Sequence, residues 1–136
     1  MHKRILIADD DASIRAHLKH LLYWEFSPVE FGEAGSSEEV LKMLAQSPWD
    51  ILILDPGLLG ENWLEIVGQL VAGGLSTPIL LFTSQPEDEF ALPSLKAGAF
   101  GYLRKNATHG LVYAIYEIWS GRKYPSSVYL AVDLRI

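Results

Sequence analysis

The sequence contains no cysteine. This absence excludes a disulfide framework, a metal site built from thiolates and a cysteine nucleophile. It is compatible with a reducing compartment, where disulfides are rare.

An excess of positive charge and long hydrophobic runs are also missing. The formal net charge is −6, which argues against binding to the phosphates of DNA or RNA or to an anionic membrane. The first apolar run, residues 5–8, stops at Asp9 and is too short for the core of a signal peptide. No run approaches the ~18 apolar residues of a membrane span. We expect a soluble, cytoplasmic chain without a membrane partner.

The sequence does contain a regular alternation of apolar runs and amphipathic segments. Its 136 residues, 49% of them hydrophobic, suit one globular domain. Runs typical of strands lie at residues 5–8, 29–34, 51–54, 79–82 and 101–104, and each precedes a segment with helical spacing. This pattern predicts an α/β fold, a parallel sheet with helices on both faces. The leading topology is the flavodoxin-like, doubly wound five-stranded sheet of order 2-1-3-4-5, with residues 29–34 at its edge.

The fourth helical segment contains an internal proline. Pro86 and three acids open the segment, but Pro93 lies inside it, where it removes a helix hydrogen bond and crowds the preceding turn. We therefore predict a helix that is short, kinked or mobile and that starts late, near Leu92.

Polar residues follow the predicted strands. The buried run at residues 51–54 ends in Asp55, and the first run ends in Asp9 and Asp10. Thr83 follows the fourth run and Lys105 follows the fifth. Each aspartate alone is equally well explained by a turn or a helix cap. Because the first and third strands are neighbours in the predicted order, however, we expect Asp9 and Asp10 to lie beside Asp55.

These residue types together favour phosphoryl chemistry. Three clustered carboxylates repel one another unless a cation intervenes, and an oxygen-only ligand set selects a hard ion such as Mg²⁺. A lysine and a threonine hydroxyl nearby suit a phosphoryl group. A carboxylate can also accept that group as an aspartyl phosphate.

Four segments, in this order on successive strands, resemble the response-regulator receiver domain of two-component signalling. They are residues 5–10 (ILIADD), 50–55 (DILILD), 82–84 (FTS) and 97–105 (AGAFGYLRK). The resemblance covers roughly residues 3–121 and implies the CheY-like form of the flavodoxin-like fold.

The resemblance implies a phosphoacceptor and a metal site. Asp55 is the residue that takes up the phosphoryl group, with Mg²⁺ as cofactor. Asp9 and Asp10 form the acidic pocket that holds the metal together with Asp55. The backbone carbonyl of Gly57 completes the metal ligands that the protein supplies.

The resemblance also implies residues that bind the phosphate and report its presence. Lys105 pairs with Asp55 or its phosphate. Thr83 follows the phosphoryl group inward on activation, and Tyr102 is the aromatic switch that turns inward as Thr83 moves.

Residues 101–105 (GYLRK) and 120–124 (SGRKY) are most similar to receivers that precede a LuxR-type helix-turn-helix. We therefore divide the chain into a receiver domain, residues 1–121, and residues 122–136, a tail or the start of a linker to an output domain that this sequence lacks. The resemblance implies a sensor histidine kinase as partner, leaves room for a homodimer, and allows DNA contact only through that further domain. It implies no enzyme, except that the chain catalyses its own phosphorylation and dephosphorylation.

The sequence departs from the family pattern close to the phosphoacceptor. Pro56 follows Asp55 directly, and Leu59 and Trp63 stand where the family usually has proline and glycine. Pro56 stiffens the loop, and Trp63 places a large apolar side chain near the mouth of the site. These departures leave an alternative interpretation open: a degenerate receiver that is never phosphorylated and acts as a protein-interaction module.

A second alternative comes from the enzymes. Residues 9–13 (DDDAS) fit the Asp-x-Asp-x-Ser/Thr pattern of haloacid-dehalogenase-like phosphohydrolases, with Asp9 as nucleophile. This reading leaves Asp55 without a role. It also lacks the acidic motif that should follow the lysine, because the next acid that could serve is Asp133.

Overall fold

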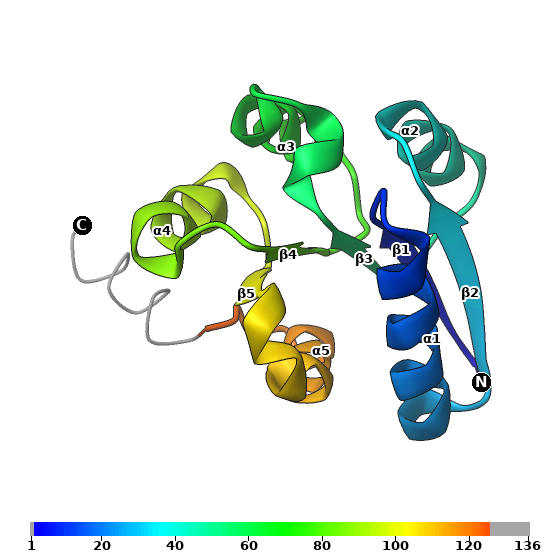
Figure 1. Cartoon of the computed structure of the whole chain (residues 1–136). Coiled ribbons are helices and arrows are strands. Elements are labelled where there is room, and N and C mark those ends of the chain that lie inside the picture. The colour runs from blue at the N-terminus through cyan, green and yellow to red at the C-terminus, as the bar shows by residue number, and fades with distance from the viewer. Residues whose placement is uncertain (1, 126–136) are drawn as a thin grey trace.

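A five-stranded parallel sheet forms the centre of the molecule (Figure 1). The computed structural model describes residues 2–125. The strands are β1 (Lys3–Ala8), β2 (Val29–Ala34), β3 (Ile51–Leu54), β4 (Ile79–Thr83) and β5 (Gly101–Arg104). Their spatial order is β2-β1-β3-β4-β5, so the predicted order and the edge position of β2 are confirmed.

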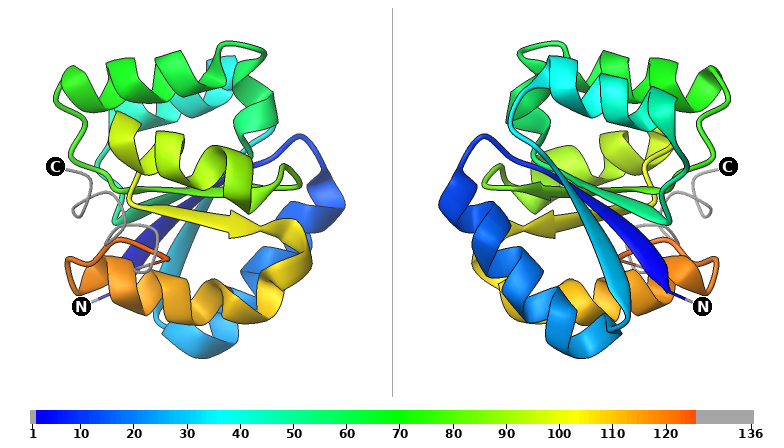
Figure 2. Two further views of the ribbon diagram at one scale, coloured as in Figure 1. Left: turned by 90° about the vertical axis from the view of Figure 1, so that its left-hand side faces the viewer. Right: turned by 90° about the vertical axis from the view of Figure 1, so that its right-hand side faces the viewer.

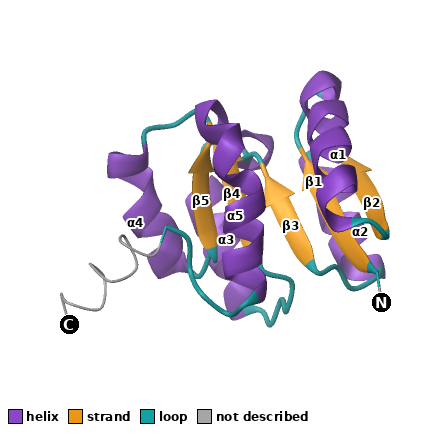
Figure 3. Cartoon of the chain, turned by 90° about the horizontal axis from the view of Figure 1, so that it is seen from below, coloured by secondary structure: helices purple, strands orange, loops and turns teal. Residues whose placement is uncertain are grey.

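Helices cover both faces of the sheet (Figures 1 and 2). The α-helices are α1 (Ala12–Phe26), α2 (Ser37–Gln46), α3 (Trp63–Ala72), α4 (Glu87–Ala97) and α5 (Leu111–Trp119). Two 3₁₀-helices precede α3 and α5, namely η1 (Pro56–Leu59) and η2 (Lys105–Gly110). Helices α1 and α5 lie on one side of the sheet, and α2, α3 and α4 lie on the other, which confirms the doubly wound prediction (Figure 3).

Strand alternation divides the core into two layers. Successive side chains of a strand point to opposite faces, so a fully apolar strand feeds both layers. In β3, Leu52 and Leu54 pack on the side of α2, α3 and α4, whereas Ile51 and Ile53 pack on the side of α1 and α5. All four are buried, as the uninterrupted apolar run predicts.

The prediction for α4 was wrong in its starting point. The helix begins at Glu87 rather than near Leu92 and continues through Pro93. Three acids in its first turn favour this N-terminus electrostatically. Proline removes only one helix hydrogen bond, and the helix runs from Glu87 to Leu92 before it reaches Pro93. The Ser94 hydroxyl also donates a hydrogen bond of 2.7 Å to the Phe90 carbonyl within the same stretch.

Residues 126–136 of the predicted tail lie outside the described residues. Of the earlier part, Tyr124 lies against β5: the Tyr102 N–H donates to the Tyr124 carbonyl, and the Tyr124 N–H donates to the Phe100 carbonyl, both at 2.9 Å. Among residues 2–125, no helix is both long enough and apolar enough to cross a membrane.

Candidate functional site

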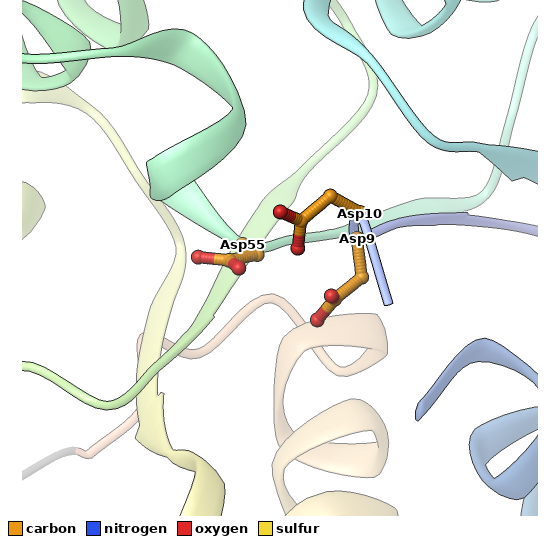
Figure 4. Close-up of side chains that lie close together, drawn as sticks. All are labelled: Asp9, Asp10 and Asp55. Atoms are coloured by element: carbon orange, nitrogen blue, oxygen red, sulfur yellow. The ribbon is translucent and has the colours of Figure 1, made fainter. Parts of the chain in front are cut away.

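The carboxyl ends of β1 and β3 bring three aspartates together. Ala8 and Leu54 are paired in the parallel ladder, so the residues that follow them, Asp9 and Asp55, leave the sheet side by side. The Asp55 N–H donates to the Ala8 carbonyl at 2.8 Å. Asp9, Asp10 and Asp55 each offer a carboxylate oxygen within 4.8 Å of the others (Figure 4). The structure therefore confirms the prediction that these three side chains lie close together.

Asp55 is fixed by the turn that follows it. Its Oδ1 accepts a hydrogen bond of 3.0 Å from the Gly57 N–H, and the residue caps the N-terminus of η1. Pro56 occupies the first turn of this 3₁₀-helix, where its fixed φ suits the helix and its missing N–H is not needed. The local sequence therefore accommodates the unusual proline and leaves the second oxygen, Oδ2, for other partners.

Lys105, which follows the last residue of β5, contacts two of the three aspartates. Its ammonium donates to Asp55 Oδ2 at 3.1 Å and lies 2.8 Å from Asp9 Oδ2. Burial lowers the pKa of Lys105, but the hydrogen bonds and charges of Asp9 and Asp55 outweigh burial and raise the pKa above its usual value. The ammonium therefore stays charged and offsets the repulsion between the carboxylates.

Asp9 is the most buried of the three aspartates. Its Oδ1 accepts a hydrogen bond of 2.9 Å from the Asp11 N–H. Its Oδ2 lies 2.8 Å from the Lys105 ammonium and has no other partner within residues 2–125. A buried oxygen with spare accepting capacity suits a cation ligand.

The donor set fits Mg²⁺. It consists of carboxylate oxygens from Asp9, Asp10 and Asp55, and Asp10 is exposed to solvent, where waters can complete the coordination. The Gly57 carbonyl accepts one hydrogen bond, from the Gly60 N–H at 3.3 Å, and keeps a second lone pair.

Asp11 has a different task from its two neighbours. Its side chain caps α1, because Oδ1 accepts from the Ser13 N–H at 2.9 Å and from the Ser13 hydroxyl at 2.6 Å. These hydrogen bonds lower the pKa of Asp11. The helix cap at Asp11 and the acidic pair at Asp9 and Asp10 are thus distinct features.

Thr83 and Tyr102 are joined through the backbone of Gln85. The Thr83 hydroxyl accepts from the Gln85 N–H at 3.1 Å, and the Tyr102 hydroxyl donates to the Gln85 carbonyl at 3.0 Å. Both side chains are buried, and the Tyr102 ring lies in the core layer beneath α2, α3 and α4. A displacement of the Thr83 hydroxyl would therefore disturb the residue that holds the Tyr102 hydroxyl.

The sequence did not identify Gln85 or Arg104 as part of this region. Gln85 contributes backbone atoms, whose partners a side-chain pattern does not reveal. The Arg104 guanidinium donates to the Ser84 carbonyl at 3.2 Å, next to Gln85. A signal was present only in the position of Thr83, since a threonine often binds the N–H two residues later in a turn.

Because the Tyr102 hydroxyl is buried, the free energy of unfolding is expected to depend on pH in the alkaline range. Burial raises the pKa of Tyr102 from its ordinary 10.0 to about 12. Between about pH 10 and 12 the folded protein retains a proton that the unfolded chain has lost, so stability should fall across this window and not below it. Urea unfolding at several pH values should show a steeper loss for the wild type than for Tyr102→Phe, which lacks the titrating group. Parallel curves would contradict the buried, neutral hydroxyl.

The Trp63 side chain was expected near the mouth of the site, but it is buried, and so is that of Leu59. The Trp63 side chain is only 6% exposed and packs against the Phe90 ring of α4, with 5.8 Å between ring centroids. Leu59 is 8% exposed and belongs to the same core layer. Both departures from the usual pattern are therefore accommodated by packing between η1, α3 and α4, and they place no apolar surface at the carboxylates.

Comparisons with known proteins agree with this fold. The response regulator UvrY of Escherichia coli K12 is 27% identical over 124 residues, covering 90% of this chain and 57% of UvrY. BvgA of Bordetella pertussis is 29% identical over 132 residues, covering 96% of this chain and 63% of BvgA. The chain thus spans about three-fifths of the length of these curated relatives.

A solved structure and a family model extend the comparison. The crystal structure of a LuxR-family two-component response regulator from Aurantimonas sp. SI85-9A1 has a TM-score of 0.80 and 26% identity, and each chain covers 100% of the other. Its description names the subfamily that residues 101–105 and 120–124 resemble. Residues 5–116 match the model of the response regulator receiver domain. The chain therefore belongs to the family of response regulator receiver domains.

Proposed function

We propose that this chain accepts a phosphoryl group on Asp55 from a sensor histidine kinase and reports it through the region around Thr83 and Tyr102. The observation that carries the proposal is the position of the Lys105 ammonium, which contacts both Asp55 and Asp9 at the carboxyl end of the sheet. A reactive carboxylate, an acidic metal pocket and a fixed cation thus meet at one point. Family membership favours this reading over the phosphohydrolase.

The transfer follows from the positions of these groups. A carboxylate oxygen of Asp55 attacks phosphorus and forms an O–P bond, while the bond from phosphorus to the donor breaks and the leaving group departs with its electron pair. The Gly57 N–H holds the Asp55 carboxylate in place at 3.0 Å. Mg²⁺, held by Asp9, Asp10, Asp55 and the Gly57 carbonyl, would neutralise charge on the transferring group. Lys105 supplies a further positive charge on the same group.

The phosphorylated state is expected to reach the rest of the fold through hydrogen bonds. A phosphoryl oxygen offers the Thr83 hydroxyl a stronger, charged acceptor than its present surroundings. A shift of the Thr83 hydroxyl toward that oxygen would lengthen its contact with the Gln85 N–H, which is now 3.1 Å. That movement would weaken the hydrogen bond from the Tyr102 hydroxyl to the Gln85 carbonyl. Phosphorylation would in this way alter the contacts between α4 and β5.

The output of this switch is proposed to be transcriptional. BvgA is named as a transcription regulator, and the Aurantimonas protein is described as a LuxR-family regulator. We propose that this receiver acts with a DNA-binding helix-turn-helix of that type. The acidic receiver would then contact DNA only through that further domain.

Phosphorylation can be tested with acetyl phosphate and Mg²⁺. Intact-mass measurement should show one added phosphoryl group on the wild type and on Tyr102→Phe, which retains the carboxylates. Asp55→Asn should show none. A phosphoryl adduct on Asp55→Asn that disappears in Asp9→Asn would favour the phosphohydrolase, and no adduct on any variant would favour the degenerate interaction module.

A further inference from the structure

A guanidinium lies against the backbone that joins two acids of the metal pocket. Arg15 belongs to α1, and its Nη1 donates a hydrogen bond of 2.6 Å to the carbonyl of Asp9, which follows the last residue of β1. The Arg15 side chain is only 18% exposed. Within residues 2–125 its acidic partner is Glu33, so Arg15 does not compete with a metal for the carboxylates of the pocket.

The Asp9 carbonyl belongs to the peptide unit that links Asp9 to Asp10. A peptide unit is planar, so a hydrogen bond to its oxygen restricts the rotation of the whole plane. That rotation sets ψ of Asp9 and φ of Asp10, and these two angles direct both carboxylates. The other side of Asp9 is also held, because the Asp9 N–H donates to the Ala34 carbonyl of β2 at 3.0 Å. Arg15 thus fixes the side of Asp9 that is shared with Asp10.

Glu33 anchors the guanidinium on the neighbouring strand. Arg15 Nε donates to Glu33 Oε1 at 3.1 Å, and Glu33 is paired with Ile7 in the ladder between β1 and β2. Hydrogen bonds from Lys19 and, to a smaller extent, from Arg15 outweigh burial and lower the pKa of Glu33, so the anchor stays ionised at neutral pH. A guanidinium directs its N–H groups in a fixed plane, which allows one side chain to bridge a carboxylate and a carbonyl.

Gly35 leaves room for this bridge. A Cβ at Gly35 would lie 3.3 Å from Arg15 Nη1, which is closer than ordinary van der Waals contact. The Gly35 N–H donates to Glu39 Oε1 at 2.9 Å, and this hydrogen bond fixes the loop after β2 against α2. The guanidinium is therefore enclosed between the ends of β1 and β2 and the loop that follows β2.

We propose that Arg15 is a positioning residue of the metal site, which directs Asp9 and Asp10 toward Mg²⁺ by holding the peptide unit between them. The inference rests on the proposed function, because it requires the metal pocket. Removing a group that orients metal ligands without touching the metal typically weakens metal binding by about 10–100-fold. Charge alone would have the opposite effect, since a cation beside an acidic pocket repels Mg²⁺. Weaker binding on loss of this cation would therefore identify positioning.

A Mg²⁺ titration of the unphosphorylated protein, followed by the NMR shift of the Asp10 amide, measures the affinity. Arg15→Met should weaken Mg²⁺ binding by at least about tenfold relative to the wild type. Lys19→Met is the matched control, because Lys19 also extends from α1 to Glu33, at 2.8 Å. Within residues 2–125 Lys19 makes no hydrogen bond or ion pair with Asp9. The control should bind Mg²⁺ at least as tightly as the wild type.

Two results would overturn the inference. If Arg15→Met binds Mg²⁺ as tightly as Lys19→Met, the positioning role is wrong and the proposed phosphorylation of Asp55 still stands. If the wild type has no affinity for Mg²⁺, both are wrong. Amide spectra without Mg²⁺ show whether each variant folds. If Arg15→Met does not fold, Arg15→Lys decides the question, because lysine keeps the charge but lacks the guanidinium fork that bridges both partners. Arg15→Lys should bind Mg²⁺ more weakly than the wild type, and equal affinity would contradict the bridge.

Discussion

Replacing Lys105 with methionine is expected to slow the phosphorylation of Asp55 by about 100-fold, the usual effect of removing one group that stabilises developing charge. Methionine keeps an unbranched apolar side chain of similar reach and removes the ammonium. That ammonium contacts Asp55 at 3.1 Å and Asp9 at 2.8 Å in the resting protein. The rate of adduct formation from acetyl phosphate, followed by intact mass at fixed Mg²⁺, measures the effect.

A second lysine offers a matched control for this substitution. Lys123 is also partly buried, and its ammonium donates to the Ala99 carbonyl at 3.1 Å while lying over the Phe100 ring. It has no contact with the carboxylates within the described residues. Lys123→Met should phosphorylate at the wild-type rate. If Lys105→Met matched that rate, the ammonium would have no part in the transfer.

Replacing Gly98 with alanine is expected to lower the free energy of unfolding by about 3 kcal/mol, which combines left-handed backbone strain with overpacking. Gly98 ends α4 with a φ of 114°, a conformation that disfavours side chains. A Cβ at this position would lie 2.6 Å from Cγ1 of Val71 in α3. Urea unfolding at neutral pH measures the loss.

Gly74 separates the two causes of that loss. Its φ is 98°, but a Cβ there would meet no atom within 4 Å. Gly74→Ala should therefore cost only about 1 kcal/mol, from backbone strain alone. The double variant Gly98→Ala/Val71→Ala should lose less stability than the sum of its two single variants, because the smaller side chain makes room. Equal losses for Gly98→Ala and Gly74→Ala would mean that α3 and α4 do not pack as closely as the structure shows.

The sheet and the meeting of Asp9, Asp10 and Asp55 were predictable from the sequence for a physical reason. Buried parallel strands have continuous apolar runs, and the order of those runs leaves few right-handed topologies. Once β1 and β3 are neighbours, the residues that follow them must lie together. The pairing of Lys105 with Asp55 was implied by the family resemblance and not by the strand order, because β4 lies between β3 and β5.

Other features depended on packing that the sequence pattern does not encode. Pro93 predicted a late helix start, but the acids before it and the packing of α4 on the sheet support an earlier one. Trp63 was expected near the mouth of the site, yet the ring of Phe90, distant in sequence, covers it. Trp24 is 74% exposed. The sequence did not predict this exposure, because an aromatic residue near the end of a helix suits a core as well as a surface.

The central claim, that Asp55 takes up the phosphoryl group, is tested most directly by locating the modified residue. After incubation with acetyl phosphate and Mg²⁺, borohydride reduction converts an aspartyl phosphate to homoserine, and peptide mass spectrometry identifies its position. The account predicts homoserine at position 55 alone, and none when Mg²⁺ is removed by a chelator. Homoserine at position 9, or at no position, would contradict it.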